Sequence, residues 1–420
     1  MSDTSNQPPE KTSSQYRIEV GGLLSEIKST DWNALSHGGN PFVRYEFLSA
    51  LETNNCVDPK YGWHPYHILL KDDQKKLIAA APAYLKTNSY GEFVFDFQWA
   101  DAYERSGSEY YPKLICAAPF TPATGPRLLV HKDHDYEQCA AALLSAAIAV
   151  VDQQNLSGMH WLFPTTEQAT LMDKHRYLRR MGCQYIWVND DYQNFEDFLS
   201  RCNSKKRKNM RRERKRVAEQ NISLSAHHGD ELNDKDWRDV INFYRDTFDR
   251  KWGTPTLNVS FFSEVGRTMG NDIIVVFATH EAKRVACSVM FKGPDTLYGR
   301  YWGCHENFHS LHFEACYYQG IDYCIRHGLK RFEPGAQGEH KIARGFVPTP
   351  TWSSHYIRDE GFRAAVAHFL KQETPFMEER CDALQTLLPF KRQEHTQTKD
   401  DGKQIANTAA ANSQNKDHQN

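Results

Sequence analysis

The alternation of short apolar segments with amphipathic helical segments, which runs through both halves of this chain, constrains its fold more than any other feature. In the first half, apolar and aromatic runs between polar turns predict strands at 64–70, 76–85, 92–97, 158–163 and 183–188. Helical patterns predict helices at 136–154 and 165–175. Strands that alternate with helices in this way predict an α/β (α+β) fold.

The second half repeats this order of elements. Apolar residues from Trp237 to Phe248 follow helical spacing and predict an amphipathic helix at 236–248. The other predicted elements are a charged helix at 195–220 with a break near 203–204, a strand meander at 272–279, 284–291 and 296–302, a helix at 310–327 ended by Gly328, a strand at 352–357 and a helix at 361–388.

The length of 420 residues exceeds what one hydrophobic core usually spans. We therefore predict two domains, at 15–194 and 195–392, with the boundary where a strand gives way to the charged helix. The polar ends at 1–14 and 393–420 contain too few apolar residues to offset chain entropy, so they are predicted to be disordered tails.

Composition excludes several classes of protein. Hydrophobic residues make up 40% and charged residues 25%, which excludes a wholly disordered chain. The 51 Lys and Arg against 53 Asp and Glu argue against a surface coated in nucleic acid. Ten cysteines without a C-x-x-C pair predict reduced thiols and a cytoplasmic location. The longest apolar run, 139–151, is shorter than the roughly 20 residues of a spanning helix, so no integral membrane segment is expected, whereas peripheral contact stays open.

Three longer segments in the second half carry a family resemblance: GRYWG at 299–303, EACYYQGI at 314–321 and GLKRFEPGAQGEHK at 328–341. Shorter matching pieces lie at 40–42, 62–65, 96–103, 110–113 and 119–127. With these motifs the chain resembles the FemAB-like branch of the GNAT acyltransferase superfamily. The resemblance implies two tandem GNAT-like domains, each a mixed, largely antiparallel sheet flanked by helices. It also implies acyl or aminoacyl transfer to a small-molecule or peptide amine acceptor.

One departure bears on the co-substrate. Relatives that use acetyl-CoA usually carry Q/R-x-x-G-x-G/A, whose backbone N–H groups hold a pyrophosphate. This chain has five Arg-x-x-Gly sequences, none followed two residues later by Gly or Ala, which begin at Arg179, Arg250, Arg267, Arg300 and Arg358. Acyl-CoA and aminoacyl-tRNA therefore both stay open as co-substrates, with tRNA as a possible partner.

The segment 333–344 is the first candidate site. Amide formation needs a base for the amine and donors for the developing oxyanion. The candidate catalytic residues are Glu339, His340 and Glu333. The candidate substrate-binding residues of this segment are Gln337 and Arg344, with Lys341 crowded between them. The alternative is a polar surface loop with a Glu–Arg pair.

The first half supplies a second set of candidate substrate-binding residues. Asp96, Trp99 and Asp101 stand in an aromatic stretch, where a buried carboxylate needs a partner such as Lys113 or Arg127. Either these acids pair, or they face a pocket for an amino-bearing substrate, with Lys113 as a further binding residue. His355 lies on a predicted strand, where a hydrogen-bonded core histidine is the alternative to a substrate contact.

A basic run forms the third candidate. Residues 201–216 contain ten Lys or Arg and one acid, a net of +9. Such a helix is either solvated and paired with acidic neighbours or contacts an anion such as tRNA. The predicted phosphate or nucleic-acid contacts are Lys205, Arg207, Arg211 and Arg214.

A Cys/His group at 304–316 has some metal-ligand spacing, but no second cluster matches it, so no metal is expected. Two rival functions stay open beside the transferase. One is a non-catalytic module that binds a peptidoglycan or amino-sugar precursor. The other is an RNA-binding protein that acts through the basic helix. The sequence leaves the oligomeric state open.

Overall fold

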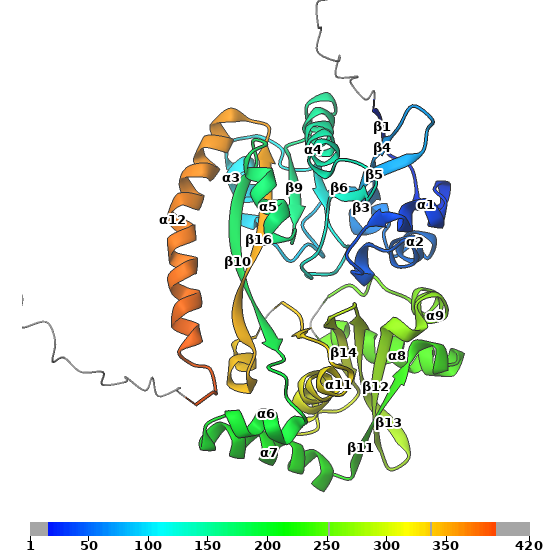
Figure 1. Ribbon diagram of the computed structural model, residues 1–420, viewed down its shortest axis with the longest axis vertical. Helices are drawn as coiled ribbons and strands as arrows, with labels where there is room; N and C mark the ends of the chain where they lie inside the picture. Colours follow the sequence, from blue (N-terminus) through cyan, green and yellow to red (C-terminus); the bar gives the residue numbers. More distant parts are fainter. Residues whose placement is uncertain (1–15, 251–252, 337, 392–420) are drawn as a thin grey trace, which may run out of the picture.

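The computed structural model describes residues 16–250, 253–336 and 338–391. The tails predicted at 1–14 and 393–420 lie outside these residues. The described chain forms two sheets with helices packed on them, in an upper and a lower group of elements (Figure 1). The α/β fold with mixed, largely antiparallel sheets flanked by helices is thus confirmed.

The larger sheet has eleven strands among the described residues. In spatial order they are β11 (Ile222–His228), β12 (Ile273–His280), β13 (Lys283–Lys292), β14 (Thr296–Cys304), β15 (Arg331–Glu333), β10 (Leu178–Val188), β16 (Val347–Ile357), β9 (Gly158–Leu162), β7 (Lys113–Cys116), β6 (Ala83–Lys86) and β3 (Trp63–Pro65). The strands of the smaller sheet are β1 (Arg17–Val20), β4 (Ile68–Lys71), β5 (Leu77–Ala81), β8 (Leu129–His131) and β2 (Leu35–Ser36).

Helices cover the faces of these sheets (Figure 1). Those of the first half are α1 (Ser29–Asn33), α2 (Tyr45–Thr53), α3 (Phe97–Arg105), α4 (Tyr136–Gln153) and α5 (Thr166–Asp173). Those that follow are α6 (Phe195–Arg201), α7 (Ser204–Glu219), α8 (Asp234–Arg250), α9 (Val259–Thr268), α10 (Leu311–Phe313), the π-helix η6 (Glu314–Tyr318), α11 (Gln319–His327), the 3-10 helix η7 (Glu339–Arg344) and α12 (Glu360–Gln385).

The two halves share one arrangement. In the first, β7 and β9 are parallel neighbours joined through α4. In the second, β14 and β15 are parallel neighbours joined through α10, η6 and α11. The long antiparallel pair β10 and β16 connects them, since β10 also pairs with β15 and β16 with β9. The sheet therefore continues on both sides of residue 195, and the domain boundary stays a prediction.

Most predicted elements are present, including the predicted break in the charged helix. The helix at 195–220 breaks where Asn203 caps α7 through the backbone of Lys206. The strand predicted at 64–70 is divided between β3 and β4, which belong to different sheets. The strand predicted at 92–97 is wrong: Phe93 has a positive φ of 60°, and the segment is a loop before α3.

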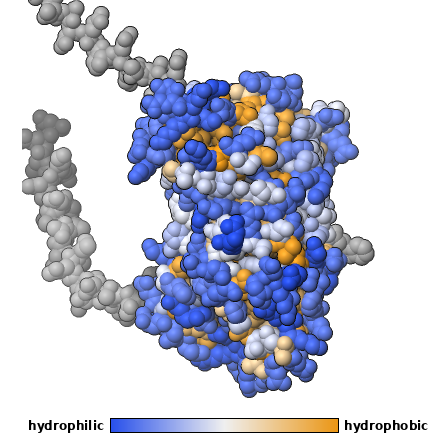
Figure 2. Space-filling model, turned by 90° about the vertical axis from the view of Figure 1, so that its right-hand side faces the viewer, coloured by the Kyte–Doolittle hydropathy of each residue, from blue (hydrophilic) through white to orange (hydrophobic). Residues whose placement is uncertain are grey.

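The side of the molecule shown in Figure 2 is mainly hydrophilic, with separate apolar patches. No helix within the described ranges is both long and apolar enough to cross a membrane. The predicted apolar face of α8 is inside, where Trp237, Val240 and Tyr244 are buried in the core cluster shared with α9 and β12.

Candidate functional site

A small cavity lies where two neighbouring strands part. β14 and β15 are paired from Thr296 opposite Arg331 to Tyr298 opposite Glu333, and beyond that β15 ends while β14 continues to Cys304. The cavity has a volume of about 70 Å³. Its walls are Ser288, Val289, Met290, Gly299, Arg300, Tyr301, Trp302, His312, Cys316, Tyr317 and Pro334. We call it the strand-gap pocket.

A β-bulge shapes the strand side of this pocket. The pairing of β13 with β14 passes from Val289 opposite Tyr301 to Met290 opposite Gly299, so Arg300 is an extra residue in β14. Bulges re-aim side chains and occur beside active sites. The Arg300 guanidinium donates through Nη2 to the Phe120 carbonyl at 2.7 Å. Its buried Nε has no hydrogen-bond partner among the described residues.

The opposite side of the strand-gap pocket is the π-helix η6. Ser288 Oγ donates to the Ala315 carbonyl at 2.8 Å, which fastens this helix to β13. The wider turn places Cys316 and Tyr317 against the pocket. Single π-turns inside helices are rare and occur frequently at functional sites.

Glu333 ends β15, one residue before the pocket wall at Pro334. Its side chain is buried at 8% exposure, and Oε2 has no hydrogen-bond partner among the described residues. Burial raises the pKa of Glu333 to about 7, although Arg331, the backbone of Thr124, Arg300 and Arg127 pull it down. A carboxyl group that titrates near neutrality, with one free oxygen, suits proton transfer.

Lys341 is a buried cation beside the same pocket. It is 2% exposed, and within the described part of the chain its one hydrogen bond goes from Nζ to the Gly335 carbonyl at 2.7 Å. Burial lowers the pKa of Lys341 to about 8; the nearby Cys316 acts to raise it and the Arg300 guanidinium to lower it further. Gly335 has a φ of +99°, a conformation that favours glycine and turns its carbonyl toward the lysine.

The rest of segment 333–344 points in different directions. Glu339 is exposed and pairs with Arg380 of α12 at 2.8 Å. His340 is partly exposed and shares a hydrogen bond with the Tyr317 hydroxyl at 2.9 Å; the partial burial of its ring and the nearby Arg344 and Lys341 lower its pKa. Arg344 is buried and forms a bidentate ion pair with Glu213 of α7. Gln337 lies outside the described residues.

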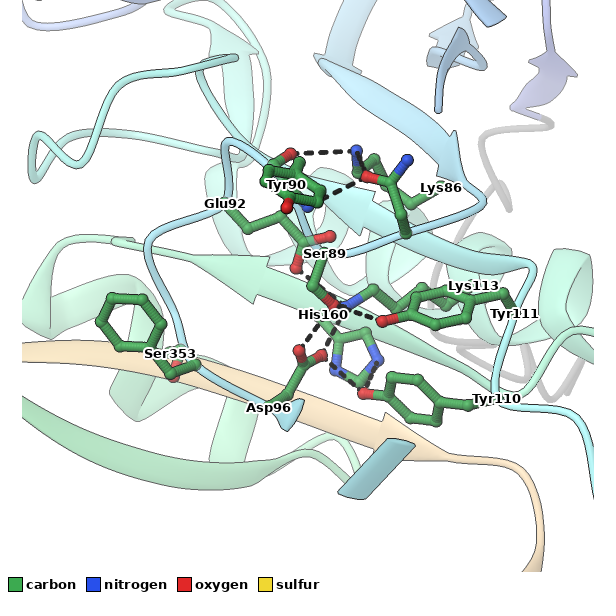
Figure 3. A network of polar contacts seen from close by, with 12 residues as sticks. Lys86, Ser89, Tyr90, Glu92, Asp96, Tyr110, Tyr111, Lys113, His160 and Ser353 are labelled. Atoms are coloured by element: carbon green, nitrogen blue, oxygen red, sulfur yellow. Dashed lines mark hydrogen bonds and ion pairs between the residues drawn. The ribbon is translucent and has the colours of Figure 1, made fainter. Parts of the chain in front are cut away.

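The first-half candidates form a buried network (Figure 3). Lys113 is fully buried and donates to Ser89 at 3.0 Å, to Glu92 at 2.8 Å and to Asp96. Asp96 also accepts from Ser89 and from Tyr110, at 2.7 and 2.6 Å. The structure therefore pairs Asp96 with Lys113, one of the two partners expected for it. Asp101 instead is exposed on α3.

Trp99 and His355 also meet in this region. The two rings pack edge to face with centroids 4.9 Å apart, and both side chains are buried. His355 shares hydrogen bonds with His160 at 2.7 Å and with the Ser353 hydroxyl at 2.8 Å. Burial lowers the pKa of His355 well below its ordinary value, so this imidazole is neutral.

The basic helix α7 is partly neutralised by its neighbours. Arg214 contacts Glu314 and Asp322 at 3.1 and 3.0 Å, and Arg211 contacts the exposed Glu196. Arg207 donates to the Cys202 carbonyl at 3.4 Å, and Lys205 is exposed. The same helix touches η6 and η7, the segments beside the strand-gap pocket.

The sequence indicated some of this site and missed the rest. Glu333 and the segment up to Arg344 were found from their polar, glycine-containing composition. Arg300 and Lys341 were not singled out, because a bulge and a buried lysine have no local sequence pattern. Among the described residues, no group of three or more Cys, His, Asp or Glu side chains is placed to hold a metal ion.

Fold and site together define an α/β protein in which one arrangement of parallel neighbouring strands occurs twice, with a pocket beside β14 where its parallel neighbour β15 ends. The chain belongs to the FemAB-like family, described as peptidoglycan biosynthesis/recognition, which matches residues 23–392. The resemblance found from the motifs is thereby confirmed. No curated protein matches the chain.

Several solved structures have a similar fold at low sequence identity. FemX is 10% identical, with 83% of this chain and 100% of that chain covered and a TM-score of 0.49. L-PGS from Bacillus licheniformis is 9% identical, with 85% and 99% covered and a TM-score of 0.48. A tandem GNAT protein from the clavulanic acid biosynthesis pathway is 11% identical, with 81% and 98% covered and a TM-score of 0.42.

Proposed function

We propose that this protein transfers an acyl or aminoacyl group to an amine of a peptidoglycan precursor, and that the reaction takes place at the strand-gap pocket. The family supports the class of substrate. The observation that carries the proposal is a group of buried, incompletely paired charges: Arg300 Nε in the pocket wall, and Glu333 Oε2 and the Lys341 ammonium, which interact electrostatically with Arg300. Buried polar groups without partners are rare and call for a ligand to explain them.

The chemistry follows from these three residues. An acceptor ammonium must lose a proton before it attacks an ester or thioester carbonyl, and Glu333, with a pKa of about 7, is suited to take that proton. Attack places negative charge on the carbonyl oxygen. Among the described residues the Lys341 ammonium donates to Gly335 alone, so its other N–H groups, with Arg300, would stabilise that charge.

The position of α7 favours aminoacyl-tRNA as the donor over acyl-CoA. This helix carries the basic run and contacts η6 and η7 beside the pocket, so a polyanion bound along α7 would end near the reacting groups. The test is the salt dependence of tRNA binding in wild type and in the double variant Lys205→Ala/Lys208→Ala, two exposed cations of α7. A shallower slope in the variant supports tRNA; identical slopes contradict it.

The transfer itself is tested by incubating the full chain with an amine-bearing peptidoglycan precursor and either aminoacyl-tRNA or acyl-CoA. Mass spectrometry then detects the new amide. Loss of general-base catalysis in Glu333→Gln should slow the reaction by about 100-fold or more. Glu339→Gln, assayed in parallel, shows which of the two glutamates is the general base. Glu196→Gln is the control at an exposed carboxylate. Absence of amide with both donors would end the proposal.

A further inference from the structure

A second cavity lies between β10, β16, α12 and the loop before α3, so both halves of the chain contribute to it. It has a volume of about 230 Å³ and shares no wall residue with the strand-gap pocket. Its walls are largely apolar and aromatic, with Phe93, Phe95 and Met377 among them. Ser353 also lines it, and Thr351, Ser353 and His355 share one face of β16 because side chains alternate along a strand.

A chain of hydrogen bonds leads from the Ser353 hydroxyl into the buried network. Ser353 Oγ lies 2.8 Å from His355 Nε2, and His355 Nδ1 lies 2.7 Å from His160 Nδ1. His160 Nε2 lies 3.4 Å from the Tyr110 hydroxyl, which donates to Asp96 at 2.6 Å. Figure 3 shows the inner end of this chain, with His160, Tyr110 and Asp96.

The carboxylate end fixes the direction of every bond in this chain. Burial alone would raise the pKa of Asp96, but the Lys113 ammonium and the hydrogen bonds from Lys113 and Tyr110 outweigh it, so the pKa is lowered and the group is ionised. An ionised carboxylate only accepts hydrogen bonds, so the Tyr110 hydroxyl donates to it. The Tyr110 oxygen is then available to accept from His160 Nε2–H.

The same reasoning continues outward to the cavity. With its proton on Nε2, neutral His160 accepts at Nδ1, so His355 donates from Nδ1–H. His355 Nε2 is left with a lone pair that faces Ser353 Oγ–H. A serine hydroxyl beside an unprotonated imidazole nitrogen, with a third group that sets the tautomer, is the arrangement of an activated nucleophile.

We propose that Ser353 is a nucleophile, activated by His355, that accepts an acyl group from an ester or thioester bound in this cavity. The apolar walls suit an apolar acyl chain. Arg180 lies opposite Ser353 in the β10–β16 register and lines the cavity; its guanidinium pairs with Glu373 and donates to the Phe95 carbonyl, and its remaining N–H groups would serve the developing oxyanion. This inference is independent of the transfer reaction proposed for the strand-gap pocket.

The reaction is balanced within the site. Ser353 Oγ forms a bond to the acyl carbon while its proton passes to His355 Nε2. The bond from the acyl carbon to the leaving oxygen or sulfur breaks, and that atom takes the proton from His355. Water then attacks the acyl-serine and gives a proton to His355, which returns it to Ser353 Oγ as the free acid leaves.

The test is covalent labelling of the full chain with a fluorophosphonate probe, followed by peptide mass spectrometry, and release of p-nitrophenolate from p-nitrophenyl acetate. We expect the probe to label Ser353 of the wild-type protein, so this first result does not depend on whether a variant folds. Ser353→Ala should abolish labelling. Ser354→Ala is the matched control, since Ser354 is the next residue, on the opposite face of β16, fully buried and without a hydrogen-bond partner among the described residues.

A further variant separates an activated serine from a merely reachable one. Tyr110→Phe keeps the ring and removes the hydroxyl that orients His160, so labelling at Ser353 should slow by about tenfold or more. Circular dichroism checks that each variant is folded. An unlabelled Ser353 in wild type, or equal labelling rates in wild type and Tyr110→Phe, would overturn the proposal.

Discussion

Lys113 and Lys341, two of the three buried lysines among the described residues, are held in opposite ways. Lys113 donates to Ser89 and to two carboxylates, Glu92 and Asp96. Lys341 donates to one backbone carbonyl, that of Gly335, and among the described residues to nothing else. Both side chains are at most 2% exposed, so water does not make up the difference.

Their pKa values follow this contrast. Burial would lower the pKa of Lys113, but Glu92 and Asp96 outweigh it, and the pKa is raised. For Lys341 burial prevails and the pKa falls to about 8. A fully paired buried charge offsets most of its desolvation cost, whereas an incompletely paired one costs stability and needs another reason to be there. We therefore infer that Lys113 has a structural role and that Lys341 interacts with a bound ligand.

The largest expected effect on stability comes from removing Lys113, the fully paired lysine. Lys113→Met leaves the carboxylates of Glu92 and Asp96 buried without their cation. The free energy of unfolding should fall by about 3–5 kcal/mol, as for other buried ion pairs that lose one partner. Denaturant unfolding measures it. A loss below about 1 kcal/mol would show that the network is not held by Lys113.

The second prediction concerns pH and Glu333. The unfolded carboxyl ionises near 4.5 and the folded one near 7, so between these values the unfolded chain releases a proton that the folded chain keeps. Wild-type stability should therefore fall by about 3 kcal/mol as pH rises from about 4.5 to about 7. Glu333→Gln lacks this titration. Parallel stability curves for the two proteins across this range would contradict the burial argument.

A smaller effect sharpens the comparison within α7. Arg214→Ala leaves Glu314, whose side chain is 5% exposed, without its cation, and should cost about 2 kcal/mol. Arg211→Ala removes a contact with exposed Glu196 and should leave the unfolding midpoint unchanged. Thermal melts of both variants give the answer. Equal shifts in the two would mean that burial does not separate these pairs.

The sequence predicted local structure better than the site, and particular residues show why. The helical spacing of apolar residues from Trp237 onward correctly predicted α8, because the residues that one helix face buries recur at a fixed interval in the sequence. The loop at 92–96 was predicted as a strand, since its apolar residues resemble one. Its irregular path depends on Lys113, which follows much later in the chain.

The candidate site shows the same limit more clearly. Glu333 stood out beside a Pro-Gly turn, but its free oxygen depends on how β14 and β15 part. Asp96 was expected to pair with Lys113 or Arg127, and the structure pairs it with Lys113. Ser353 was not predicted, although its partner His355 was, because the residues that orient His355, namely His160 and Tyr110, are far from it in the sequence.

The most direct test of the account is the amide-forming rate of Lys341→Met, measured beside its stability. Holding Lys341 charged in the folded state at pH 7 costs about 3 kcal/mol, because its pKa falls from 10.5 to about 8. The variant should therefore unfold at an equal or higher denaturant concentration than wild type, while amide formation falls by about 100-fold or more. A stable variant that transfers at the wild-type rate would contradict the role assigned to Lys341 and to its pocket.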